Sequence, residues 1–386
     1  MATNSSIEIG SQVTFPKQIL SSELYPFLNS FLCVLILVFG MPAICFNAVN
    51  VFIFCKIGVT DSITVCFLHL AVCDFCTMVA LALGAYFTLF TVLGVPGSEN
   101  FFTYAFATAT TYGLFSDVAS ATITYIALQR GLCVAWPFLA RNAFTRNRSI
   151  VVLIIITVFL LGCGMPRAVS FRFIQIFDPS SNSSQILIVH FSEIYDQVDN
   201  FYLIFVKLFM GFTQYIIMSV CAVAIFIGMT SSMRLKSTAS STGSDSQAIP
   251  KSVKKSENLE GDDKKTDKSF KFINAETKKE KEKKAPQKEL LVIKQALTVV
   301  LLQIFCTTPG IIAFIYSLFE PRFEIGTEYH NLYFVVYACV DLSNAVNAFA
   351  NFFIYLNFNT KFRHCFHSVF HCGKLAKETA NVSSRK

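Results

Sequence analysis

The chain has 386 residues, of which 53% are hydrophobic and only 15% are charged, and its formal net charge is +7. Soluble domains carry about 25% charged residues, so this composition excludes an ordinary soluble domain and predicts a membrane protein. The sequence contains no metal-ligand spacing, nucleophile elbow or phosphate-binding loop, so we expect no enzyme, no bound metal and no nucleic-acid partner.

Seven apolar stretches are long enough to cross a bilayer, since a spanning helix needs about 20 residues. In chain order they are 27–55, 62–94, 101–130, 149–170, 201–229, 290–318 and 331–357. Backbone hydrogen bonds must close internally in lipid, so these stretches are expected to be helices. The third is the most polar and contains Asp117, which suits a helix in the middle of a bundle. The predicted fold is therefore an all-α membrane protein, a seven-transmembrane helix bundle.

Lys and Arg are distributed unevenly among the connecting segments. The segment 230–288 holds 15 of them, and the 141–148 loop holds Arg141, Arg146 and Arg148. The alternate segments, 1–26, 95–100, 171–200 and 319–330, hold at most one each. Basic residues favour the inner side of a membrane. We therefore expect a multi-pass plasma-membrane protein with an extracellular N-terminus and a cytoplasmic C-terminus.

This orientation divides the chain into five parts. They are an extracellular segment at 1–26, five transmembrane helices with their loops at 27–229, a basic third intracellular loop at 230–288, two further helices at 289–357, and a cytoplasmic tail at 358–386. The 230–288 loop lacks apolar periodicity and is predicted to be disordered. The sequons at Asn4 and Asn182 fall on the outer side and are candidate glycosylation sites.

Five short motifs occur, one each in the first, second, third, sixth and seventh stretches. They contain, in order, Phe46 and Asn47; Leu70, Ala71 and Asp74; Gln129, Arg130 and Gly131; Phe305, Cys306 and Pro309; and Asn351 and Tyr355. Together with the span number, this arrangement resembles the rhodopsin-like (class A) G-protein-coupled receptors over all seven spans. Phe358, Lys361, Phe362 and Arg363 look like the short amphipathic eighth helix of that family.

The resemblance implies a receptor that binds an extracellular ligand in the outer half of the bundle and activates a heterotrimeric G protein inside. Arrestin and kinases would be further partners. The Lys-rich third inner loop and the motif set resemble diverged invertebrate receptors, particularly mollusc-type chemosensory receptors and neuropeptide receptors. The alternative is a multi-span secondary transporter, although the sequence shows no internal repeat.

A polar core is expected around Asp74, because a carboxylate at mid-membrane must be paired, hydrated or protonated. The amides of Asn47, Asn347 and Asn351 are its expected neighbours. In the family this cluster can hold a sodium ion. Here Ala119 replaces the usual serine ligand, so a sodium ion and a water-filled hydrogen-bond network both remain open.

The activation switch implied by the resemblance centres on Arg130. A guanidinium costs about 2.5–3.5 kcal/mol at a bilayer centre, so it belongs at a helix end or beside a cavity. Gln129 replaces the carboxylate that usually restrains this arginine. Glu289 lies about 30 Å before Pro309 along a helix, at the inner rim, where it would either pair with Arg130 or be an ordinary surface acid. The remaining switch residues are the hinge Pro309 and the pair Asn351 and Tyr355.

The ligand is expected between the third, fifth, sixth and seventh spans. Candidate pocket residues are Tyr112, Asp117, Lys207, Thr307 and Asp341. Tyr112 stands where amine receptors of the family carry an aspartate, which argues against a conventional biogenic amine. Other roles than ligand binding remain open for these residues. Lys207, like Arg167, would extend to the lipid headgroups. Asp117 and Asp341 would be held in internal salt bridges or hydrogen bonds.

The cysteines do not form the extracellular disulfide that is usual in the family. Ala105 stands at the expected position in the third span, and residues 171–200 contain no cysteine. Cys365 and Cys372, near the inner membrane surface, are candidates for palmitoylation.

Overall fold

The computed structural model describes residues 20–21, 23–96, 98, 100–177, 185–242, 265–324 and 327–370. Among these residues, seven helical runs are long and apolar enough to cross a membrane. They are α1 (Leu24–Ile57), α2 (Ser62–Val92), α3 (Phe101–Ala135), α5 (Arg146–Val169), the continuous run of α6 (Tyr195–Phe201), η1 (Tyr202–Met210) and α7 (Gly211–Thr242), α8 (Lys265–Phe319), and α9 (His330–Phe358). The predicted bundle of seven spans is confirmed.

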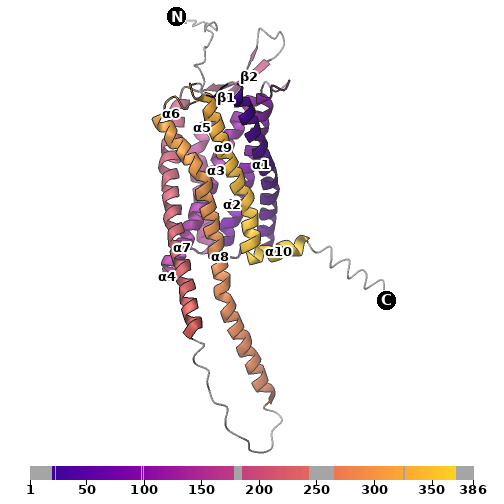
Figure 1. The fold of residues 1–386 in the computed structure, drawn as a ribbon, viewed down its shortest axis with the longest axis vertical. Coiled ribbons are helices and arrows are strands. Elements are labelled where there is room, and N and C mark those ends of the chain that lie inside the picture. Colours follow the sequence, from indigo (N-terminus) through magenta and orange to yellow (C-terminus); the bar gives the residue numbers. More distant parts are fainter. Residues whose placement is uncertain are drawn as a thin grey trace, which may run out of the picture.

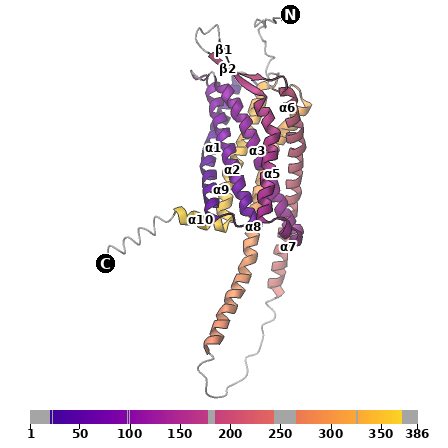
Figure 2. The same cartoon turned by 180° about the vertical axis from the view of Figure 1, so that it is seen from behind.

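These helices lie side by side in one elongated bundle (Figures 1 and 2). A β-hairpin lies at one end, and the short helix α10 (Thr360–Phe370) lies at the other. We refer to these as the hairpin end and the α10 end. Both α7 and α8 continue beyond the bundle at the α10 end.

Helix α3 lies at the centre, where it contacts α2, α5, α7 and α8, as its polar composition predicted. Two glycines permit its close packing. A Cβ atom on Gly164 of α5 would lie 2.1 Å from the Leu114 Cδ2 atom of α3. A Cβ atom on Gly131 of α3 would lie 3.1 Å from the Cys221 Sγ atom of α7. The side chains of Leu114 and Cys221 thus pack directly against glycine backbone, which lets α3 lie close to α5 and α7.

The outer surface of the bundle is apolar. Large side chains such as Val38, Ile155 and Phe305 are 57%, 60% and 78% exposed, respectively. Several polar side chains, including Asn47 and Asn351, are fully buried instead. This arrangement suits helices surrounded by lipid, whose polar groups must be satisfied within the protein.

A two-stranded antiparallel hairpin joins α5 to α6, and the sequence analysis did not anticipate it. Strand β1 (Phe171–Phe177) pairs with β2 (Gln185–Phe191), so that residue 171 faces residue 191 and residue 177 faces residue 185. Both strands are rich in Phe, Ile and Val, which favour extended backbone. This composition was the available sequence signal.

The predicted amphipathic eighth helix is confirmed as α10. It begins after Asn359, whose side-chain oxygen accepts a hydrogen bond of 3.0 Å from the Phe362 backbone N–H. The Phe362 ring is fully buried, with its centroid 5.2 Å from that of Phe54 in α1. Lys361 donates a hydrogen bond of 2.8 Å to Asp61, the residue that caps the start of α2. Both contacts hold α10 against the bundle.

The third connecting loop contains more helical backbone than expected. Helix α7 ends at Thr242 and α8 begins at Lys265, so helical turns cover much of the 230–288 segment that was predicted to be disordered. Its Lys and Glu residues have high helix propensity, which accounts for these turns. Residues 243–264 lie outside the described residues, as do Asn4, Asn182 and Cys372, whereas Cys365 is half-buried in α10.

Candidate functional site

A cavity of about 640 Å³ opens among the helices in the half of the bundle nearer the hairpin end. Ligand pockets in proteins commonly enclose about 300–1,000 Å³, so the cavity suits a small molecule or a short peptide segment. It is lined by all the candidate pocket residues, namely Tyr112, Asp117, Lys207, Thr307 and Asp341. Their role in ligand binding stays a prediction.

Lys207 and Asp117 form an ion pair on one side of this cavity. The Lys207 Nζ atom lies 2.5 Å from the Asp117 Oδ1 atom. The Tyr202 hydroxyl donates to the other carboxylate oxygen at 2.5 Å. Lys207 therefore points inward rather than to the headgroups, and Asp117 is satisfied by an internal salt bridge.

The π-helical turns of η1 explain why Tyr202 and Lys207 reach the same acid. Residues five apart on an α-helix are separated by about 140° around the axis. A π-helix has a wider turn, with hydrogen bonds between residues five apart, and places such residues on one face. The Lys207 ammonium accordingly lies 5.5 Å from the centre of the Tyr202 ring.

Arg167 forms a second ion pair nearer the hairpin end. Its Nε atom lies 2.5 Å from the Asp199 Oδ1 atom of α6. Arg167 thus joins α5 to α6 at the edge of the cavity, and it too points to a protein partner rather than to headgroups. Ala105, at the position of the family's usual cysteine, lines the cavity, and every described cysteine is free.

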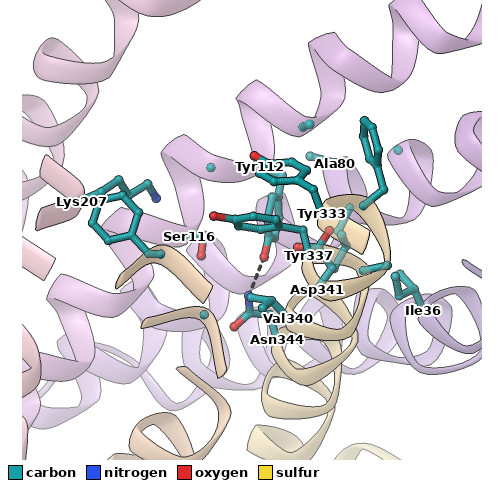
Figure 3. A pocket seen from close by; sticks show the side chains of 18 of the residues that line it. Ile36, Ala80, Tyr112, Ser116, Lys207, Tyr333, Tyr337, Val340, Asp341 and Asn344 are labelled. Atoms are coloured by element: carbon teal, nitrogen blue, oxygen red, sulfur yellow. Dashed lines mark hydrogen bonds between the residues drawn. The ribbon is translucent and has the colours of Figure 1, made fainter. Parts of the chain in front are cut away.

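Helix α9 contributes a polar and aromatic stripe to the cavity. Tyr333, Tyr337 and Asp341 are spaced by four residues and lie on one face of the helix. Asn344 continues the stripe and donates a hydrogen bond of 2.6 Å to the Tyr112 hydroxyl of α3 (Figure 3). Asp341 lies beside the Tyr112 ring in the same part of the cavity.

The polar core lies below the cavity, toward the α10 end. Asn351 donates a hydrogen bond of 2.8 Å to the buried Asp74 carboxylate. Asn347 lines the same small cavity as Asp74, but the hydrogen bonds that Asn47 and Asn347 donate go to other partners, so their grouping around Asp74 stays a prediction. Asn47 donates to the Ala348 carbonyl oxygen at 3.3 Å, which joins α1 to α9. Asn347 donates to the Gln303 side-chain oxygen of α8 at 2.7 Å.

A second cavity beside Asp74 measures about 20 Å³, which is enough for about one water molecule. Ala119 lines it where a serine would offer an oxygen. Thr77, Ser116 and Ser120 also line this cavity, so the sodium ion stays a prediction, and we assign it no part in the mechanism.

Gln303 is a site residue that the sequence analysis missed. Its side-chain oxygen accepts from Asn347 of α9 at 2.7 Å, and its side-chain nitrogen donates to Ser120 of α3 at 3.2 Å. Gln303 therefore links α8 to α9 and α3 at a level between the cavity and the polar core. The available signal was a lone amide in the middle of an apolar span, which is costly unless it is bonded.

Near the α10 end, the Gln129 side chain is buried and bonds to α2. Its side-chain nitrogen donates to the Ser62 hydroxyl of α2 at 2.7 Å. Ser62 lies 2.5 Å from the Ser149 hydroxyl of α5, which also bonds to Tyr125 at 2.9 Å. This four-residue network fixes the lower part of α3 to α2 and α5 with neutral groups alone.

The other switch residues lie around this network. Arg130 is half-buried in α3, whereas the side chain of Glu289 lies outside the described residues, so their pairing stays a prediction. Tyr355 is fully buried, and its hydroxyl has no hydrogen-bond partner among the described residues. Before Pro309, Thr308 donates to the Ile304 carbonyl oxygen at 2.6 Å, a bond type that bends helices.

At the α10 end, Asp61 joins the start of α2 to α10. Partial burial alone would raise the pKa of Asp61, but hydrogen bonds from Lys361 and Thr64 outweigh it and lower the pKa below the usual range. The Asp61 carboxylate thus acts as a helix cap and as one partner of an ion pair.

The model of the family described as 7 transmembrane receptor (rhodopsin family) matches residues 46–355, which is most of the chain. The matched range begins in the first motif and ends at the last residue of the fifth motif. The comparison with curated proteins gave no match.

Proposed function

Because the chain belongs to the rhodopsin family of seven-transmembrane receptors, we propose that it binds a ligand in the cavity at the hairpin end and activates a heterotrimeric G protein at the α10 end. The hairpin end would face the outside of the plasma membrane. The Lys- and Arg-rich segments at the opposite end support this orientation. The family consists of receptors rather than enzymes, and membership disfavours the alternative of a secondary transporter.

The observation that carries the proposal is that one central helix serves both ends. Helix α3 brings Tyr112 and Asp117 to the cavity and Arg130 to the polar network near α10. Tyr112 and Arg130 are separated by about 27 Å of helical rise. A ligand that changes the position of α3 relative to α8 and α9 would therefore change the surroundings of Arg130.

The α10 end also offers an apolar surface for a partner. Trp136, Phe138 and Leu139, at and just after the end of α3, are 61%, 91% and 63% exposed. Exposed apolar groups near the end of α3 that carries Arg130 suit the docking of an amphipathic protein segment. We assign this surface to the G protein.

Activation follows if the ligand binds two arrangements of the bundle with different affinity. Pro309 lacks the amide hydrogen bond inside α8, which makes this helix the natural moving part. The Tyr355 hydroxyl has no partner among the described residues, which supports a second arrangement, because a buried polar group without a partner costs about 1–3 kcal/mol. Opening of α8 would give that hydroxyl new partners.

We further propose that the receptor serves a chemosensory or neuropeptide role. The Lys-rich segment between α7 and α8 and the departures at Gln129 and Thr307 support this finer assignment. A screen of odorants, amino acids and neuropeptides on cells that carry the chain and a promiscuous G protein tests it. A response to none of the three classes would contradict it.

The G-protein assignment is tested with Arg130→Ala in the same cells. We expect the variant to reach the cell surface at the wild-type level and to lose G-protein activation. Undiminished signalling by Arg130→Ala at an equal surface level would contradict the assignment of a G-protein-coupled receptor.

A further inference from the structure

Four side chains that line the large cavity are ordinarily charged, namely Asp117, Lys207, Arg167 and Asp341. Both cations already hold a carboxylate. Lys207 pairs with Asp117, and Arg167 pairs with Asp199, each at 2.5 Å. The charges within each pair neutralise each other. Asp341 is therefore the one lining carboxylate without a cationic partner among the described residues.

Asp341 lies beside neutral groups. The Asn344 amide donates to the Tyr112 hydroxyl at 2.6 Å, and Tyr112 lies beside Asp341 in Figure 3. The Asp341 carboxylate has oxygen lone pairs for a further donor, since a carboxylate can accept about four hydrogen bonds. A carboxylate in such a site gains most from a partner that carries positive charge.

Aromatic rings surround the same acid. The ring centroids of Tyr333 and Tyr337 lie 4.5 Å apart, about two turns and one turn, respectively, from Asp341 along α9. Figure 3 shows these two rings and Tyr112 gathered beside Asp341, with Lys207 lying apart from them. Cations are attracted to the faces of aromatic rings, and an aromatic cage with a carboxylate is a common way to bind an ammonium group.

We propose that the ligand carries a cationic amine or ammonium group, and that this group binds the Asp341 carboxylate within the ring cluster of Tyr112, Tyr333 and Tyr337. The inference rests on the proposed receptor function and names the chemical class of its ligand. It also assigns the acidic partner to α9, whereas Tyr112 of α3 contributes one ring of the cluster. The Asp117–Lys207 pair then limits the size of the ligand on the opposite side.

The test uses the purified full chain and three probes of nearly equal shape: 2-phenylethylamine, 2-phenylethanol and 3-phenylpropionate. A ligand that binds the folded state raises the melting temperature. We expect the amine to raise it and the alcohol and the carboxylate to leave it unchanged. Asp341→Asn should abolish the amine effect, Asp341→Glu should retain it, and Asp196→Asn, at an exposed position of α6, should leave it unchanged.

Equal shifts from the three probes, including no shift from any of them, would overturn the proposal. So would an amine effect that survives in Asp341→Asn. The measurement needs no G protein, so its outcome is separate from that of the signalling test. Amine binding that depends on Asp341 without any G-protein activation would refute the proposed coupling and leave the ligand chemistry standing.

Discussion

At the scale of single residues, the ion pair between Lys207 and Asp117 sets the charge on one side of the cavity. Their side chains are 34% and 17% exposed, so the pair is neither fully buried nor at the surface. The sequence identified both residues as pocket candidates, but it did not identify them as partners. Helical spacing of 3.6 residues puts Tyr202 and Lys207 on different faces, and only the π-helical turns of η1 bring both to Asp117.

Asp117→Asn should destabilise the protein, because it leaves the Lys207 ammonium without its carboxylate. Exposed pairs contribute about 0.2–1 kcal/mol, and breaking a buried pair costs about 3–5 kcal/mol. For this half-buried pair we expect a loss of about 1–3 kcal/mol in the free energy of unfolding, measured by denaturation in detergent.

The double variant Asp117→Asn with Lys207→Met is the control for this prediction. It removes both charges and should recover most of the lost stability. A double variant whose loss equals the sum of the two single losses would show that the residues are not coupled.

At the scale of elements, the sequence predicted helices more reliably than their contacts. Apolar length predicted the first four spans and the seventh to within about five residues, whereas the helices of the fifth and sixth spans extend further into the connecting segment. The Phe362 side of α10 followed from its amphipathic spacing. The hairpin of β1 and β2 was missed because its short apolar runs do not differ from loop segments near a membrane. The packing of α3 against α5 was also beyond the sequence, since nothing marks Gly164 rather than Gly162 as the contact.

Gly164→Ala should separate α3 from α5. The added Cβ atom would lie 2.1 Å from the Leu114 Cδ2 atom and 3.4 Å from the Tyr202 ring. Overpacking of this kind costs about 1–3 kcal/mol, which a thermal unfolding curve would show. Gly162→Ala is the matched control, because its Cβ atom would meet nothing within 4 Å. Equal stability of the two variants would mean that the helices tolerate a wider separation.

Lys361→Gln should weaken the attachment of α10 in a pH-dependent way. The lowered pKa of Asp61 means that its ionised form is stabilised in the folded protein. This contribution is fully present above the unfolded pKa of about 3.9 and is lost as the pH falls through the lower folded pKa. Wild type should therefore exceed the variant in stability by about 0.2–1 kcal/mol at pH 7, and the difference should vanish in strong acid.

Arg363→Gln is the matched control for α10. Arg363 is exposed and donates to the Asn357 carbonyl oxygen instead of an acid, so its variant should show no such pH dependence. Unfolding curves of the three proteins from neutral to acidic pH decide the question. A gap between wild type and Lys361→Gln that persists in strong acid would contradict the role of Asp61.

At the scale of the whole molecule, the sequence predicted the bundle, and its motifs suggested the two ends at which we propose that ligand and G protein bind. The composition required a membrane protein, and the order of the five motifs resembled one receptor family, whose model matches residues 46–355. The internal connections were not predictable. Gln129 joins Ser62 rather than Arg130, and Gln303 joins α3 to α9, because both contacts depend on how distant helices are rotated against each other.

This arrangement has a consequence for signalling without ligand. Gln129 contributes no charge beside Arg130, which leaves Glu289 as the acidic restraint expected from the sequence. We expect measurable ligand-free G-protein activation, increased further by Glu289→Gln and unchanged by Glu193→Gln near the hairpin. A wild-type receptor that is silent without ligand, and that stays silent in Glu289→Gln, would show that another group holds Arg130.

The most direct test of the account is the rate at which the purified chain, in lipid nanodiscs, accelerates GDP release from heterotrimeric G proteins. We predict that the wild-type chain accelerates release without added ligand. Arg130→Ala, with an unchanged melting temperature, should return the rate to that of the G protein alone. Acceleration by Arg130→Ala equal to that of the wild type would contradict the account, because the α10 end would then not act through this arginine.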